Sequence, residues 1–140
     1  MDIRRYKAEY RVLAAQIPAR RFGFIWDSRP RLEVVSPIAI GGVMVAAYKV
    51  KIYGLNDFPE EEPIVTPGMI LRDHDGEEMK EPSRANHLIG EYNGETHLCI
   101  YSEWNPDYSL YKTATRAAVW LAAYYYHMKT GRNIDSYLSH

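Results

Sequence analysis

Cysteine is nearly absent from this sequence, because Cys99 is the only one among 140 residues. A single cysteine excludes an internal disulfide and any structural zinc site built from two or more thiolates. The sequence also lacks a phosphate-binding loop, a dinucleotide fingerprint and an HExxH zinc motif. We therefore expect no metal and no cofactor, and we expect a reducing, cytoplasmic location.

An excess of charge of one sign is also missing, since 17 Lys and Arg residues stand against 18 Asp and Glu residues. This balance gives no electrostatic case for nucleic acid or for an anionic membrane. The longest apolar runs, residues 38–48 and 117–126, reach about half of what a membrane span needs. The charged N-terminus also has no apolar segment of a secretory signal behind it. The length predicts a single domain over residues 1–140.

Local charge is uneven although the total is balanced. Residues 1–31 carry eight basic and three acidic side chains, whereas residues 57–81 carry nine acidic and two basic ones. Two solvated faces are the plain interpretation of such runs. A basic docking face for a partner is the alternative.

Two segments have the spacing of amphipathic helices. In residues 2–17, apolar side chains recur at steps of three and four, and Pro18 ends the pattern. In residues 109–130, Ser109 is a plausible N-cap and Gly131 a C-terminal stop. The second helix is apolar nearly all round, which is typical of a helix wrapped by its own domain or shared with a partner.

Segments rich in β-branched and aromatic residues, separated by turn residues, predict four strands between the helices. They are residues 22–26, 31–40, 46–53 and 63–67, the last placed at a sheet edge because prolines bound it. Residues 68–95 show no periodicity and are long for a connection, so we expect a functional segment there. The order of elements predicts an α+β fold.

Cys99 is the strongest candidate for chemistry. A lone cysteine is most often a small buried apolar residue, and reactivity needs partial exposure and a polar neighbour. His97 would share a face with Cys99 in an extended segment, and His87 lies within reach in the preceding loop. The triplet Asp73-His74-Asp75 suggests a metal site but has no companion cluster, so we interpret it as a solvated turn.

Several short motifs follow one another in a particular order and spacing. They are Tyr48-Lys49-Val50-Lys51-Ile52, Pro63-Ile64-Val65, Pro67, His87, Asn93-Gly94-Glu95-Thr96-His97-Leu98-Cys99-Ile100-Tyr101, Glu103-Trp104, Ser109-Leu110 and Thr130-Gly131. Over residues 45–131 this pattern resembles the stand-alone ubiquitin-conjugating-enzyme-like proteins of bacterial CBASS antiphage operons.

The resemblance implies a ubiquitin-conjugating-enzyme-like fold: an N-terminal helix, a four-stranded antiparallel meander, an active-cysteine loop and a C-terminal helix. It implies that Cys99 accepts an acyl group as a thioester and passes it to an amine. The implied partner is a cGAS-like nucleotidyltransferase, whose C-terminal tail supplies the acyl group.

Thioester exchange sets physical demands that point to further catalytic residues. An oxyanion needs hydrogen-bond donors, which Asn93 and its turn offer. A lysine nucleophile must lose a proton, and the carboxylates of Glu103 and Asp107 are candidates for assisting this step. We add His97 to this catalytic set because of its spacing from Cys99.

The sequence departs from the wider ubiquitin-conjugating pattern at its His-Pro-Asn motif. Here Leu88-Ile89 follow His87, and the segment to Cys99 is two residues longer. We therefore expect His87 to support the loop through ring hydrogen bonds. Trp104 and Pro106 are expected to shape the mouth of the site by packing.

Two other functions remain open at this point. A non-catalytic adapter would bind and stabilise the nucleotidyltransferase through Trp120 and Tyr124 of the second helix, and Cys99→Ala would leave it intact. A cysteine hydrolase would use a histidine to deprotonate the thiol, and His97→Ala would then be as damaging as Cys99→Ala.

Overall fold

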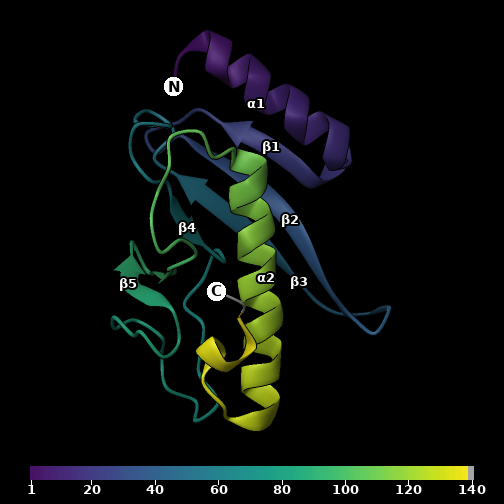
Figure 1. Ribbon diagram of the computed structural model, residues 1–140, viewed down its shortest axis with the longest axis vertical. Helices are drawn as coiled ribbons and strands as arrows, with labels where there is room; N and C mark the ends of the chain where they lie inside the picture. The colour runs from purple at the N-terminus through teal and green to yellow at the C-terminus, as the bar shows by residue number, and fades with distance from the viewer. Residues whose placement is uncertain (139–140) are drawn as a thin grey trace.

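The protein is described by a computed structural model that covers residues 1–138 (Figure 1). Helices and sheet strands appear in the order that the sequence predicts, with a small second hairpin between them. The elements are α1 (Ile3–Gln16), η1 (Ala19–Arg21), β1 (Phe22–Ile25), β2 (Arg31–Ile40), β3 (Val43–Tyr53), β4 (Ile64–Thr66), β5 (Leu88–Tyr92), β6 (Glu95–Leu98), α2 (Leu110–Thr130) and η2 (Ile134–Tyr137).

The main sheet confirms the predicted antiparallel meander. Its strands are hydrogen-bonded in the order β1-β2-β3-β4, which leaves β4 at an edge. Gly41 and Gly42 join β2 to β3 with φ values of 59° and 79°, as a two-residue hairpin turn requires. On β3, Val50 and Ile52 are fully buried, which confirms the alternation in residues 46–53. The α+β class therefore follows from local sequence patterns.

Helix α1 docks on the start of α2 through one buried carboxylate. Asp2 caps α1 by accepting a hydrogen bond from the Arg5 backbone N–H at 2.7 Å. The Glu9 side chain accepts a hydrogen bond from the Leu110 backbone N–H at 2.9 Å. This N–H has no acceptor within α2, and the negative carboxylate also stabilises the positive end of the helix dipole. Glu9 and Leu13 are the buried residues of α1, and most of the rest of this helix faces solvent.

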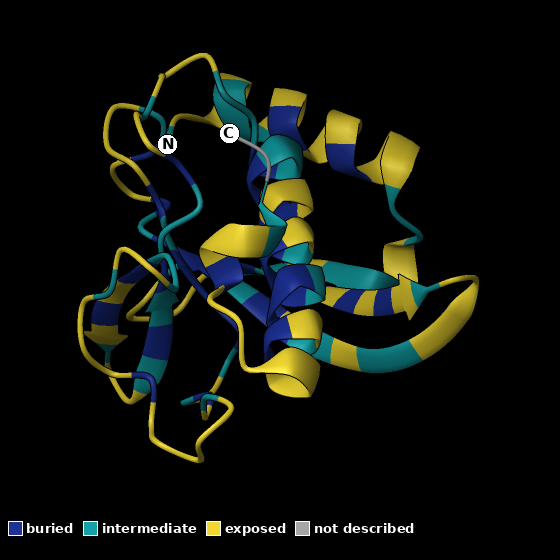
Figure 2. Ribbon diagram, turned by 60° about the horizontal axis from the view of Figure 1, so that its bottom comes forward, coloured by how far each residue is buried: buried dark blue, intermediate teal, exposed yellow. Residues whose placement is uncertain are grey.

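Helix α2 packs its long apolar face over the sheet (Figure 2). Ser109 accepts a hydrogen bond from the Lys112 backbone N–H, and Gly131 ends the helix with a left-handed φ of 76°. Both predicted ends of this helix are thus confirmed. None of the helices in residues 1–138 has the length and apolar character needed to cross a membrane.

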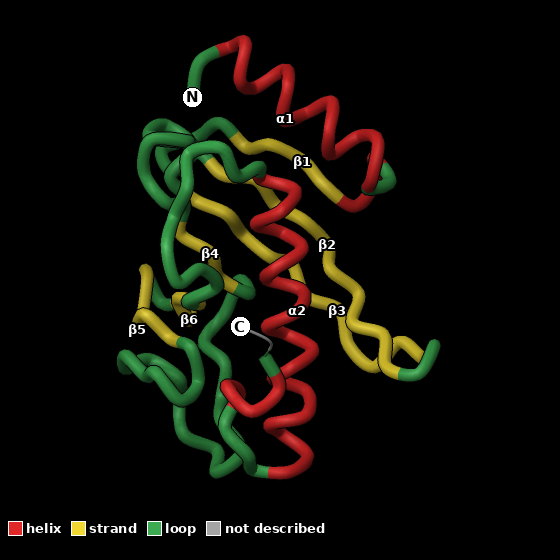
Figure 3. Tube along the Cα trace, viewed as in Figure 1, coloured by secondary structure: helices red, strands yellow, loops and turns green. Residues whose placement is uncertain are grey.

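The prediction that residues 68–95 are without regular structure is wrong. Strand β5 lies in this segment and pairs antiparallel with β6 through a turn at Asn93-Gly94 (Figure 3). The Thr96 hydroxyl accepts the Leu71 backbone N–H and donates to the Met79 carbonyl, which fixes the loop before β5. These side-chain to backbone bonds order the loop without creating a periodic apolar pattern.

The second hairpin is attached to the main sheet through Glu95. The hydroxyls of Tyr53 and Thr66 both donate to its carboxylate, and the Lys51 ammonium lies 3.8 Å from it. Burial and the Glu95 charge raise the pKa of the Tyr53 phenol, so this phenol stays a donor at every physiological pH. The contact fixes where β6, and hence Cys99, lies relative to the sheet.

Candidate functional site

Cys99 is placed by the end of β6. Its backbone N–H donates to the His87 carbonyl at 2.9 Å, which extends the β5–β6 pairing by one residue beyond the strand. The thiol is half-buried and donates to the Tyr101 carbonyl with a sulfur–oxygen distance of 3.5 Å. The sulfur is therefore held by local backbone and is still accessible from one side.

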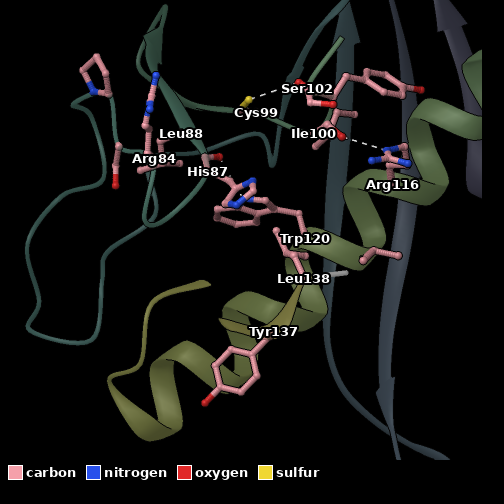
Figure 4. A pocket seen from close by; sticks show the side chains of 14 residues that line it. Arg84, His87, Leu88, Cys99, Ile100, Ser102, Arg116, Trp120, Tyr137 and Leu138 are labelled. Atoms are coloured by element: carbon pink, nitrogen blue, oxygen red, sulfur yellow. Dashed lines mark hydrogen bonds between the residues drawn. The ribbon is translucent and has the colours of Figure 1, made fainter. Parts of the chain in front are cut away.

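That side is a pocket of about 910 Å³ between α2, η2 and the segments around Cys99 (Figure 4). This volume is at the upper end of the range for small-molecule sites. Its apolar wall includes Ile100, Val119 and Leu138, and its polar lining includes His87 and two arginines. The only thiol of the protein thus opens into the larger of its described cavities.

His87 lies beside Cys99 and is firmly held. Its backbone has a positive φ of 51°, a strained position for a residue with a side chain. The strain is supported because its carbonyl accepts both the Cys99 N–H and the Trp120 indole N–H, the latter at 3.1 Å. Its ring nitrogen Nε2 lies 2.6 Å from the Asp135 carboxylate. His87 therefore holds the Cys99 loop through its backbone, whereas its ring contacts η2.

His97 does not join Cys99 in the pocket. Cys99 lies past the last residue of β6, so the alternation of the strand no longer relates the two side chains. The His97 ring instead packs edge-on against Tyr92 at 6.4 Å, and His97 does not line the pocket as described. Burial lowers the pKa of His97, so its ring is neutral at physiological pH. The histidine that shares the pocket with Cys99 is His87.

The structure does not bring the other predicted catalytic residues to the sulfur. Asn93 sits exposed at the tip of the β5–β6 hairpin, with a φ of 47° that the turn demands. The chain rises by about 3.3 Å per residue in a strand, so β6 separates Asn93 from Cys99 by well over a hydrogen-bond length. Glu103 and Asp107 are exposed in the loop before α2 and do not line the described pocket. The structure therefore corrects the placement of Asn93, Glu103 and Asp107 beside the Cys99 sulfur.

Trp104 packs behind the loop that follows Cys99. Its indole N–H donates to the Pro59 carbonyl at 2.8 Å, and its ring lies edge-on to Tyr101 at 5.3 Å. Pro106 is exposed, and its carbonyl accepts a hydrogen bond from the Arg5 side chain at 3.4 Å. Trp104 thus supports the segment that holds the thiol from behind, while Pro106 belongs to the contact between α1 and the loop.

Trp120 and Tyr124 are core residues, so the prediction that they form a docking surface is wrong. Their side chains are 1% and 8% exposed and stack on each other at 5.7 Å. The Trp120 indole donates to the Asn86 and His87 carbonyls, and the Tyr124 hydroxyl donates to the Arg72 carbonyl at 2.6 Å. Burial within the domain thus explains part of the apolar surface of α2, whereas Val119, Tyr126 and Met128 on the same helix are exposed.

The Asp73-His74-Asp75 triplet is a loop docked on the end of α2. The His74 backbone N–H donates to Nε2 of the buried His127, and the His74 ring donates to the Met128 carbonyl at 2.9 Å. Within residues 1–138, no three His, Cys, Asp or Glu side chains gather as metal ligands would. The sequence interpretation as a fully solvated turn missed this tertiary contact.

The electrostatic surroundings keep the Cys99 sulfur protonated. Burial raises the pKa of the thiol, and the negative charge of Glu62 raises it further. The pKa of Glu62 itself is raised by its own desolvation. Because the thiolate is the nucleophile, we expect Cys99 to react slowly with small reagents at neutral pH. Glu62 was visible in the sequence only as part of an acidic run.

We expect the alkylation of Cys99 by iodoacetamide to report this raised pKa. The rate should rise about tenfold per pH unit and reach its midpoint above the midpoint of N-acetylcysteine. Glu62→Gln removes the repelling charge and should move the midpoint down. Intact mass spectrometry of samples quenched across pH 7 to 10.5 measures both profiles, and a midpoint below that of N-acetylcysteine would contradict this account of the site.

Comparison of the chain with protein-family models, with curated proteins and with solved structures finds no match. The chemistry assigned to the site therefore rests on its own geometry. The feature that carries most weight is the accessible thiol at the rim of a large pocket, beside a histidine that bonds a carboxylate.

Proposed function

We propose that this chain is a cysteine-dependent acyl carrier and transferase with the ubiquitin-conjugating-enzyme fold. Cys99 holds the acyl group as a thioester, and the group comes from the C-terminal tail of a cGAS-like nucleotidyltransferase in antiphage defence. The observation that carries the proposal is the placement of the only thiol, half-buried and open to a pocket of about 910 Å³.

The order of elements supports the fold part of the proposal. An N-terminal helix precedes a four-stranded antiparallel meander, the cysteine follows in an irregular stretch, and a long helix covers the sheet. This is the order that the resemblance to ubiquitin-conjugating enzymes implies.

The site supports a carrier more than a hydrolase. In the first step the Cys99 sulfur attacks the carbonyl carbon of an acyl adenylate or thioester; a C–S bond forms, and the activating group leaves with the thiol proton. In the second step an amine attacks the same carbon, the C–S bond breaks, and the sulfur regains a proton. A raised thiol pKa suits this exchange, because a sulfur that is protonated at rest avoids side reactions.

A thiol that is protonated at rest does not attack an unactivated carboxylate, so the acyl group must be activated elsewhere. The chain has no nucleotide-binding motif, so a separate enzyme supplies the acyl adenylate or thioester. Approach of the acyl donor displaces water from the pocket, which protects the acyl group from hydrolysis. The protein then holds the acyl group until an amine arrives.

The test is intact mass spectrometry of this protein co-expressed with a cGAS-like nucleotidyltransferase and with the enzyme that activates its C-terminal carboxylate. We expect a species whose mass equals both chains minus one water and which disappears on treatment with a thiol reductant. A complex that contains only unmodified chains under both conditions would refute acyl transfer and would favour the adapter function instead.

A further inference from the structure

Two arginines flank Cys99 at the pocket. Arg84 comes from the loop before β5 and Arg116 from the first half of α2, and Figure 4 shows them on opposite sides of the sulfur. Both residues are exposed. The described lining of this pocket contains no Asp or Glu, so its fixed charge is positive.

The Arg116 guanidinium is fixed before any ligand arrives. Its Nε donates to the Ile100 carbonyl at 2.9 Å, and its Cζ lies 5.1 Å from the centre of the Tyr101 ring. The Tyr101 ring is itself buried and hydrogen-bonded to Thr113. The Nη donors of Arg116 are therefore held beside the residue that follows Cys99, and a guanidinium fork suits a carboxylate.

Glu62 acts on Cys99 and Tyr101 from outside the pocket lining, but it forms no ion pair with either arginine. Arg31 and Arg72 have carboxylate partners within 4.0 Å, and so do the lysines of the sheet, Lys49 and Lys51. In residues 1–138, no such carboxylate pairs with either flanking arginine. A charge left unpaired beside a nucleophile is available to a ligand.

Between the arginines the pocket wall is apolar. Ile100, Val119 and Leu138 line it, and Val119 is about half exposed without a ligand. The volume of about 910 Å³ is too large for a single small anion and accommodates several residues of an extended peptide. Such a peptide matches the lining if apolar side chains lie between acidic ones.

We propose that this pocket selects an acidic peptide segment, with one carboxylate on Arg116, another on Arg84 and apolar side chains between them. The proposal rests on the proposed function and names its substrate class: the segment belongs to the protein tail that loads Cys99. Charge complementarity decides the occupant, because an uncharged apolar tail would leave both arginines unpaired in a partly dry pocket.

The test measures binding without chemistry. The probe is a fluorescein-labelled peptide of sequence Gly-Asp-Leu-Val-Leu-Asp-Gly with an amidated C-terminus, which has no activated carbonyl and cannot load the thiol. Fluorescence anisotropy should show binding to the wild-type protein that weakens as salt rises. The matched peptide with both Asp residues replaced by Asn should bind about tenfold less tightly.

Charge exchange at Arg116 makes the test specific. Arg116→Gln should reduce the affinity for the acidic peptide about tenfold and leave the Asn peptide unchanged. Arg116→Glu should reverse the preference, so that a peptide with Lys at both positions binds better than the acidic one. Arg20→Gln, a substitution of an exposed arginine outside the pocket, is the control and should change nothing.

Three results would overturn the inference. The first is equal binding of the Asp and Asn peptides, and the second is an Arg116→Glu protein that still prefers the acidic peptide. The third is displacement of the peptide by AMP or inorganic phosphate at concentrations below that of the peptide. The last result would make the pocket a phosphate site. Charge-selective binding in a protein that forms no thioester would refute the proposed function alone. Thioester formation without charge selectivity would refute this inference alone.

Discussion

Cys99→Ala is expected to abolish the thiol-labile adduct with the nucleotidyltransferase, a loss of at least about a thousandfold in conjugate formed. No other side chain of this protein can form a thioester, because Cys99 is its only thiol. The substitution removes a half-buried sulfur whose one side-chain bond is a weak donation to the Tyr101 carbonyl. Stability should therefore change by less than about 1 kcal/mol, so loss of the adduct would report chemistry and not unfolding.

Two further substitutions separate the mechanisms that involve Cys99. Cys99→Ser should give an ester that survives thiol reductants, and Cys99→Lys an amide that also survives hydroxylamine. Both variants form this bond only if an activated acyl group is delivered to position 99. The mass of the adduct, again both chains minus one water, therefore identifies the bond. Conjugates that persist in Cys99→Ala would contradict the carrier function.

The adapter alternative needs a different surface from the one that the sequence favoured. Because Trp120 and Tyr124 are buried, their substitution disturbs the core and cannot report docking. Val119 is exposed on the same helix and lines the Cys99 pocket, so Val119→Glu changes the pocket wall without disturbing the core. An adapter would lose its partner in Val119→Glu and keep it in Cys99→Ala. The hydrolase alternative is weakened by the structure, since His97 packs on Tyr92 and lies outside the pocket lining.

The elements that sequence predicted best have local causes. The end of α2 at Gly131 follows from a φ of 76°, which glycine adopts without strain. The turn at Gly41-Gly42 follows from the same freedom, and the strand after it from strict alternation of apolar residues. Each sequence signal lies within a few residues of the structure that it specifies, so it can be recognised without knowledge of the fold.

Strand β5 was missed because the residue types at Ile89 and Gly90 are the opposite of what the burial of these two positions would suggest. Gly90 occupies an inward position where an apolar side chain is expected, while Ile89 points outward and is exposed. The backbone explains the glycine, because its φ of 144° is a conformation that residues with side chains rarely adopt. Without a side chain at this position, the strand shows no apolar alternation.

The candidate site was predicted in part for similar reasons. Cys99 and His87 stand out by residue type. Asp135 and Arg116 do not, because their places beside the site depend on the packing of η2 and α2 against segments 48 and 16 residues away. The wrong choice of Trp120 and Tyr124 came from treating aromatic residues on a helix as surface, when tertiary packing had buried them.

Trp120→Ala is expected to cost about 3–5 kcal/mol of unfolding free energy, a large part of the roughly 5–15 kcal/mol of a typical domain. The side chain is among the largest that are fully buried, and its loss leaves a cavity between α2 and the Cys99 loop. Urea unfolding followed by circular dichroism measures the change. Met128→Ala, on the exposed side of the same helix, is the matched control and should cost less than about 1 kcal/mol.

Trp120→Phe separates the packing of this residue from its hydrogen bonds. The phenyl ring keeps most of the buried volume, but the Asn86 and His87 carbonyls lose the indole N–H, at a cost of about 1–3 kcal/mol. The His87 carbonyl then depends on the Cys99 N–H alone, so the backbone around the thiol loosens. Alkylation of Cys99 should accordingly become faster in Trp120→Phe and stay unchanged in Met128→Ala. Equal alkylation rates in the two variants would show that Trp120 acts on stability only, and that the strained His87 backbone is held by the strands themselves.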